Sequence, residues 1–160
     1  MGSPGDLIPA DVGRGRRNFS LSSPLAGIDA GDEANTVPRA RLLLVEDDAL
    51  IRENLGEILL LEGYEVVAAE DGLHALELLR EQPTPDLVIT DLQMPRANGW
   101  VLATELRREP RLANLPLVVI SGVHDSRAAG GFLGASATFQ KPFDVAHFLD
   151  TLERLLNLSP

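Results

Sequence analysis

The chain has 160 residues, of which 44% are hydrophobic and 24% are charged, a balance typical of a globular domain with one core. Its formal net charge of −10 argues against a nucleic-acid-binding surface, since phosphate backbones attract an excess of Lys and Arg. Cysteine is absent, which excludes disulfides and thiolate metal sites, and no apolar run approaches the roughly 18 residues of a membrane span. We therefore expect a cytoplasmic protein without nucleic acid or membrane partners.

The first part of the chain, residues 1–38, is rich in Gly, Pro, Ser, Asp and Asn and sustains neither a helix nor a strand period. Such a segment buries too little apolar area to offset its chain entropy, so we predict a disordered tail. Residues 39–160 are predicted to form the folded domain. They carry most of the negative charge, with eleven basic against nineteen acidic residues.

From Arg41 onward, short apolar runs alternate with amphipathic stretches of helical period. The apolar runs are Leu42–Val45, Val66–Ala69, Leu87–Thr90, Leu117–Ser121 and Ala137–Gln140. The first amphipathic stretch places five apolar residues on one helical face: Leu50, Ile51, Leu55, Ile58 and Leu59. Runs without polar alternation are typical of strands buried on both faces, and strand–helix alternation predicts a parallel sheet. The sequence therefore predicts a doubly wound α/β domain with a five-stranded parallel sheet and helices on both faces.

Polar residues follow the predicted strands, where a sheet of this kind binds its ligands. They are Glu46, Asp47 and Asp48 after the first run, Asp91 after the third, Ser121 at the end of the fourth, and Lys141 after the fifth. Clustered carboxylates repel one another unless a cation neutralises them, and oxygen ligands alone favour a hard ion such as Mg²⁺. Asp48 is the exception, because its position suits a helix N-cap.

Lysine occurs only once in the chain, at Lys141, among fourteen basic residues. An ammonium is a compact point charge on a flexible stem, which suits contact with a single phosphoryl or carboxylate oxygen. Carboxylates, a hydroxyl, a lysine and a hard cation together suit phosphoryl transfer to an aspartate, a reaction that depends mainly on positioning and charge neutralisation.

Four segments, LLLVEDDALIREN, LVITDLQMPRANGW, LVVISG and GASATFQKPF, resemble the receiver domains of two-component response regulators. The resemblance covers nearly all of residues 41–157. The motifs also occur in order at family-like separations, with 44 residues from Asp47 to Asp91 and 30 from Asp91 to Ser121. The resemblance to receiver domains implies a flavodoxin-like strand order, 2-1-3-4-5.

The resemblance implies a role for each residue at the predicted site. Asp91 would accept a phosphoryl group from a phosphohistidine of a sensor histidine kinase or histidine phosphotransfer protein. The implied ligands of a Mg²⁺ or Mn²⁺ ion are Glu46, Asp47, Asp91 and the backbone carbonyl of Gln93. Ser121 would supply the switch hydroxyl. Lys141 would contact the phosphoryl group, and its peptide bond to Pro142 would be cis. The domain would take part only in its own phosphorylation and dephosphorylation, without being an enzyme.

Two departures from the family pattern affect the region that transmits its signal. Lys141 lies only 20 positions after Ser121, about two fewer than expected, and the predicted fourth helix carries Gly130 and Gly131, each unfavourable in a helix interior. Thr138 stands where the family usually has Tyr or Phe. We therefore expect phosphorylation to act by ordering or shifting the fourth helix.

Three functions compete. The first is a stand-alone receiver that signals through protein–protein contacts with an output protein that the sequence does not identify. The second is an aspartate-dependent phosphohydrolase, but such enzymes need a second acid two residues after the nucleophile, where this chain has Gln93. The third is a scaffold that acts without phosphorylation, or a receiver fragment of a larger regulator or hybrid kinase.

Overall fold

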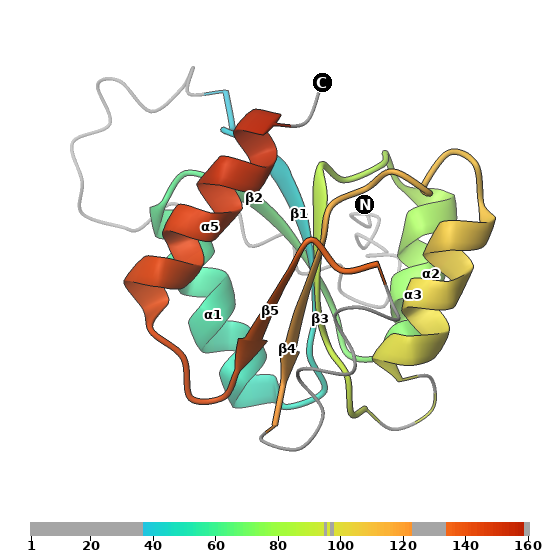
Figure 1. Cartoon of the computed structure of the whole chain (residues 1–160), viewed down its shortest axis with the longest axis horizontal. Coiled ribbons are helices and arrows are strands. Elements are labelled where there is room, and N and C mark those ends of the chain that lie inside the picture. The colour runs from blue at the N-terminus through green and yellow to red at the C-terminus, as the bar shows by residue number, and fades with distance from the viewer. Residues whose placement is uncertain (1–36, 95, 97, 123–133, 159–160) are drawn as a thin grey trace, which may run out of the picture.

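A five-stranded parallel sheet stands at the centre of the computed structural model, which describes residues 37–94, 96, 98–122 and 134–158 (Figure 1). The described elements are β1 (Arg41–Val45), α1 (Ala49–Leu61), β2 (Glu65–Ala69), α2 (Gly72–Glu81), β3 (Leu87–Asp91), α3 (Gly99–Arg108), β4 (Leu117–Ser121), β5 (Ala137–Gln140) and α5 (Val145–Leu158). The strand order is β2-β1-β3-β4-β5 and every neighbouring pair is parallel. The predicted fold class and strand order are confirmed.

The central strands are apolar on both sides because helices cover both faces of the sheet. Along β1, Leu42 and Leu44 pack into the core beneath α1 and α5, whereas Leu43 and Val45 pack into the core beneath α2 and α3. Figure 1 shows these two helix pairs on opposite sides of the sheet. This alternation of faces explains why the strand is continuously hydrophobic.

The first turn of α1 does not belong to the core, contrary to its apolar pattern. Leu50 is 67% exposed and Ile51 38%, whereas Leu55 and Leu59 are buried. The helix begins just beyond the end of β1, so its first turn lies at the edge of the sheet and only the later turns pack on it.

Side-chain caps fix the helix starts at the edge where the strands end. Asp48 accepts a hydrogen bond from the Ile51 amide at 3.0 Å, which confirms its predicted role as an N-cap. Asp71 caps α2 and Asn98 caps α3 in the same way. The loops between strand and helix are therefore held in defined positions around the strand ends.

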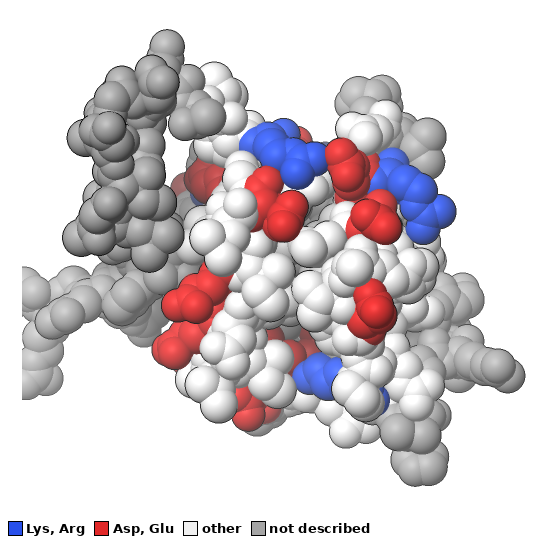
Figure 2. Space-filling model, turned by 90° about the vertical axis from the view of Figure 1, so that its left-hand side faces the viewer, with Lys and Arg blue, Asp and Glu red and all other residues white. Residues whose placement is uncertain are grey.

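The face formed by α1 and α5 carries more acidic than basic side chains (Figure 2). Exposed acids on these helices include Glu53 and Glu57 of α1 and Asp150 and Glu153 of α5. This face therefore carries a net negative charge.

Two expectations lie outside the described residues: the disorder predicted for most of residues 1–38 and the fourth helix within 123–133. Among the described helices, none has the length and hydrophobicity needed to cross a bilayer.

Candidate functional site

The predicted site residues meet at the edge where the parallel strands end. Ligand oxygens of Glu46, Asp47 and Asp91 all lie within 4.8 Å of one another. Lys141 enters from the end of β5 and places its Nζ 2.7 Å from Asp91 Oδ2 and 3.0 Å from Glu46 Oε2. Residues up to 95 positions apart in the chain thus form one cluster.

The cluster holds more negative than positive charge, and two of its carboxylates, Glu46 and Asp91, are buried. Burial raises the pKa of the Glu46 carboxyl above its ordinary value; the hydrogen bond from Lys141 opposes this rise and the charge of Asp91 adds to it. Burial alone would lower the pKa of the Lys141 ammonium, but its hydrogen bonds to Asp91 and Glu46 outweigh that effect and raise the pKa. Burial thus determines the direction of the pKa shift at Glu46, whereas the two carboxylates together determine it at Lys141.

Asp91 is held from two directions. Its Oδ1 accepts a hydrogen bond from the Gln93 amide at 3.1 Å, and its Oδ2 accepts one from Lys141. The Thr90 hydroxyl donates to the Asp91 carbonyl at 2.8 Å. Because both carboxylate oxygens have donors, the side chain is oriented before any ligand arrives.

Ser121 lies at the end of β4 and is fully buried. Its hydroxyl has no hydrogen-bond partner among the described residues. An unpartnered buried hydroxyl is uncommon, because desolvation without a hydrogen bond is unfavourable. The geometry therefore leaves Ser121 with an unused donor and acceptor at the strand-end edge.

Thr138, the second residue predicted to act in switching, lies on β5, and the predicted cis bond follows that strand. Thr138 is exposed, whereas Phe139 faces the other way and packs against Phe148, with ring centroids 5.2 Å apart. The peptide bond between Lys141 and Pro142 is cis. The strand thus directs its aromatic ring into the α1–α5 core and leaves the opposite side to a small side chain.

A divalent cation would find a suitable set of ligands here. The three clustered carboxylates supply oxygen ligands, the type that Mg²⁺ and Mn²⁺ prefer, and Asp47 is exposed and so accessible to a hydrated ion. The backbone carbonyl of the exposed Gln93 belongs to the loop that follows Asp91. The donor set therefore fits the metal that the sequence predicts.

Sequence reasoning missed Gly99, whose backbone lies against that of Asp91. A Cβ at this position would lie 2.4 Å from the Asp91 carbonyl oxygen and 3.0 Å from Leu92 Cα. The Gly99 amide also donates to the Leu92 carbonyl at 3.0 Å. Only glycine allows α3 to start so close to the candidate acceptor.

Gly99→Ala is accordingly expected to destabilise the domain by about 1–3 kcal/mol, the usual range for forced overpacking. Helix propensity alone would favour alanine by about 1 kcal/mol, so the sign of the effect distinguishes the two influences. Gly122→Ala is the control, because no atom of the described residues lies within 4 Å of a Cβ there. Urea unfolding of both variants measures the effect, and a Gly99→Ala protein as stable as the parent would contradict the close approach.

Sequence reasoning also missed Arg52, on α1. Its guanidinium Nη1 donates to the Glu46 carbonyl at 2.8 Å and approaches the Asp47 carbonyl at 3.4 Å. A basic residue near the N-terminus of a helix is unfavourable by itself, because that end carries the positive pole of the helix dipole. This unusual placement is the one sequence signal that could have identified Arg52.

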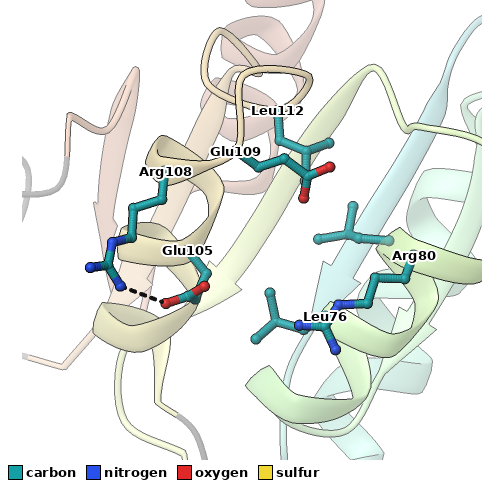
Figure 3. Close-up of a pocket in the computed structure, with 7 residues that line it drawn as sticks. Leu76, Arg80, Glu105, Arg108, Glu109 and Leu112 are labelled. Carbon is teal, nitrogen blue, oxygen red and sulfur yellow. Dashed lines mark hydrogen bonds and ion pairs between the residues drawn. The ribbon is translucent and has the colours of Figure 1, made fainter.

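A separate groove of about 230 Å³ lies between α2 and α3 (Figure 3). Apolar side chains and two arginines and two glutamates line it, among them the Arg108–Glu105 ion pair at 3.4 Å. None of the strand-end residues described above contributes to it. The groove and the acidic cluster are therefore distinct features.

Comparison with known proteins identifies the family of the domain. The family model for the response regulator receiver domain matches residues 42–153. The chain is 38% identical over 134 residues to the transcriptional regulatory protein PdtaR of Mycobacterium tuberculosis, an alignment covering 83% of this chain and 62% of PdtaR. It is 33% identical over 118 residues to the DNA-binding dual master transcriptional regulator RpaA of Synechocystis, covering 72% of this chain and 48% of RpaA. The chain thus spans less than two thirds of the length of these relatives.

Solved structures give the same result. The non-phosphorylated receiver domain of HemR from Leptospira biflexa superposes with a TM-score of 0.66 at 35% identity, covering 78% of this chain and 98% of that one. The receiver domain of a signal transduction histidine kinase from Syntrophus aciditrophicus gives a TM-score of 0.69 at 29% identity, covering 74% of this chain and 90% of that one. The chain belongs to the family of response regulator receiver domains of two-component signalling.

Proposed function

We propose that Asp91 accepts a phosphoryl group from the phosphohistidine of a sensor histidine kinase or histidine phosphotransfer protein. The observation that carries the proposal is the 2.7 Å contact between Asp91 Oδ2 and the ammonium of the only lysine in the chain. The ligands of the assisting Mg²⁺ or Mn²⁺ would be Glu46, Asp47, Asp91 and the Gln93 backbone carbonyl.

The reaction needs little from the protein beyond placement and charge. An Asp91 carboxylate oxygen forms a bond to phosphorus while the bond from phosphorus to the histidine nitrogen breaks, and that nitrogen keeps the electron pair. A divalent cation held by Glu46, Asp47 and Asp91 would neutralise part of the negative charge at the site. Lys141 binds a further phosphoryl oxygen, and the Ser121 hydroxyl, which lacks a partner among the described residues, hydrogen-bonds another.

The output is a change in protein–protein contacts, in the cytoplasm, with Ser121 and Thr138 as the switch residues. Thr138 has no ring to rotate and is restricted at χ1, so it changes its surroundings only slightly. We infer that ordering or shifting of the predicted fourth helix, within residues 123–134 and mostly outside the described part of the chain, carries most of the signal. Hydrogen exchange with and without a beryllofluoride phosphoryl mimic tests this, and equal protection of that segment in both states would refute it.

A second candidate is that the chain is the receiver part of a longer regulator or hybrid kinase. The observation in its favour is that PdtaR and RpaA, both named as transcriptional regulators, extend well beyond the aligned region. In that case a further domain would deliver the output, while the chemistry at Asp91 stays the same.

Phosphorylation with acetyl phosphate tests the proposal. With Mg²⁺, intact mass should show a single phosphoryl adduct, and chelation of the metal should prevent it. A phosphohydrolase would instead release inorganic phosphate from monoesters in many turnovers, and a phosphorylation-independent scaffold would show no adduct. Either of the last two results would overturn the receiver function.

We also propose that residues 39–160 form the functional domain and that residues 1–38 are a disordered tail. Arg39 supports this boundary, because its guanidinium pairs with Glu153 at 2.8 Å and lies 5.2 Å from the centre of the Tyr64 ring. A shortened chain of residues 37–160 should match the full chain in melting temperature and phosphorylation. A clearly lower melting temperature would place the boundary earlier.

A further inference from the structure

Arg52 contacts the backbone of the acidic pair rather than its carboxylates. Its Nη1 donates to the Glu46 carbonyl at 2.8 Å and approaches the Asp47 carbonyl at 3.4 Å, and the side chain is half-buried. It forms no ion pair within 4.0 Å with any acidic residue in the described part of the chain, although three consecutive acids, residues 46–48, lie beside it. The guanidinium is therefore hydrogen-bonded to the backbone of the turn between β1 and α1.

The position of Arg52 in α1 makes this contact notable. Asp48 is the N-cap and the Arg52 amide donates to the Asp48 carbonyl, so the arginine stands in the first turns of the helix. The positive end of the helix dipole disfavours a cation there, and a salt bridge does not compensate for it. The backbone carbonyls of Glu46 and Asp47 are what the guanidinium binds instead.

Those two carbonyls belong to the residues whose side chains face Asp91. The backbone of Glu46 is also fixed from the β2 side, because its amide donates to the Ala69 carbonyl at 3.1 Å. Asp47 is exposed, and Arg52 is the side chain that approaches its carbonyl. We propose that Arg52 is a positioning residue, which holds the turn at Glu46 and Asp47 so that both carboxylates face the divalent cation. This inference rests on the proposed metal-dependent function.

Charge and position have opposite consequences for cation affinity. If Arg52 acted only through its positive charge, it would repel a nearby Mg²⁺, and its removal would tighten binding. If it positions the ligands, its removal should weaken binding by about 10–100-fold, the usual loss when groups that orient metal ligands are removed. The direction of the change therefore separates the two roles.

The experiment is calorimetric titration of Mg²⁺ into the full chain and three variants. Arg52→Gln should raise the Mg²⁺ Kd at least tenfold, and Arg52→Lys, which keeps a charged donor, should show a smaller loss. Arg80→Gln is the matched control: it removes the same charge from an exposed position on α2, at the separate groove, and should leave the Kd unchanged. Melting temperatures without Mg²⁺ show that each variant is folded at the temperature of titration.

The possible results separate the positioning role of Arg52 from the metal-dependent function on which it rests. Unchanged or tighter binding by Arg52→Gln, with normal binding by the parent chain, would overturn the positioning role alone. If Arg52→Gln fails to fold, Arg52→Lys decides the question. A loss of Mg²⁺ affinity in the lysine variant beyond that of the Arg80→Gln control supports positioning, and parental affinity in the lysine variant refutes it. No Mg²⁺ binding by the parent chain would overturn the metal-dependent function and this inference with it.

Discussion

Asp91→Asn is expected to abolish phosphoryl uptake from acetyl phosphate while leaving the domain folded. The substitution removes the nucleophilic oxygen and one charge of the proposed cation site. Both Asp91 oxygens accept hydrogen bonds, from the Gln93 amide and from Lys141, so the asparagine NH₂ must face one of these donors. The lost bond costs about 1.5–3 kcal/mol, and relief of the repulsion between Glu46 and position 91 offsets part of that.

Asp86→Asn is a matched control for this variant. Asp86 lies just before β3, at the opposite end of the strand from Asp91, and its Oδ2 accepts a hydrogen bond from the Arg41 amide at 2.8 Å. The asparagine oxygen can accept that bond, so phosphorylation should match the parent. Intact mass after incubation with acetyl phosphate and Mg²⁺ is the measurement. A single adduct that persists in Asp91→Asn would assign the acceptor to another residue.

The fold and the membership of the cluster could be predicted because both follow from local pattern and topology. Continuous apolar runs such as Leu87–Thr90 indicate strands covered on both faces, and parallel strands bring their ends to one edge. That rule alone brings Glu46, Asp91 and Lys141 together from three separate strands. Asp48 could likewise be separated from the cluster, because capping depends on a short local sequence.

The features that sequence reasoning missed depend on where helices and strands end and on how closely they pack against one another. A helical period places Leu50 and Leu55 on the same face, but it does not say that the sheet ends beneath the first turn. The approach of Gly99 to the Asp91 carbonyl depends on how α3 docks, and the Arg52 contacts depend on a side-chain conformation. Each is a tertiary distance, which periodicity and spacing do not encode.

Lys141→Met is expected to slow phosphorylation by acetyl phosphate by about 10²–10³-fold, the usual effect of removing one group that stabilises developing charge. Methionine keeps the length of the side chain but not its charge. Without Mg²⁺ the variant should also melt at a lower temperature, because Glu46 and Asp91 lose the ammonium that they share at 3.0 and 2.7 Å. A lost hydrogen bond to a charged group costs about 1.5–3 kcal/mol.

Added Mg²⁺ should restore more stability to Lys141→Met than it adds to the parent chain. In the parent, Lys141 already neutralises part of the charge that a divalent cation would neutralise, and the two cations repel one another; in the variant, the carboxylates have no other cation. Arg108→Met is the control, because Arg108 is an exposed cation paired with Glu105 on α3 and such pairs contribute about 0–1 kcal/mol. Melting curves with and without Mg²⁺ measure both effects. A Lys141→Met protein that is phosphorylated at the parental rate would show that the lysine does not contact the phosphoryl group. An equal rise in melting temperature on adding Mg²⁺ to the variant and to the parent would show that the cation binds away from Glu46 and Asp91.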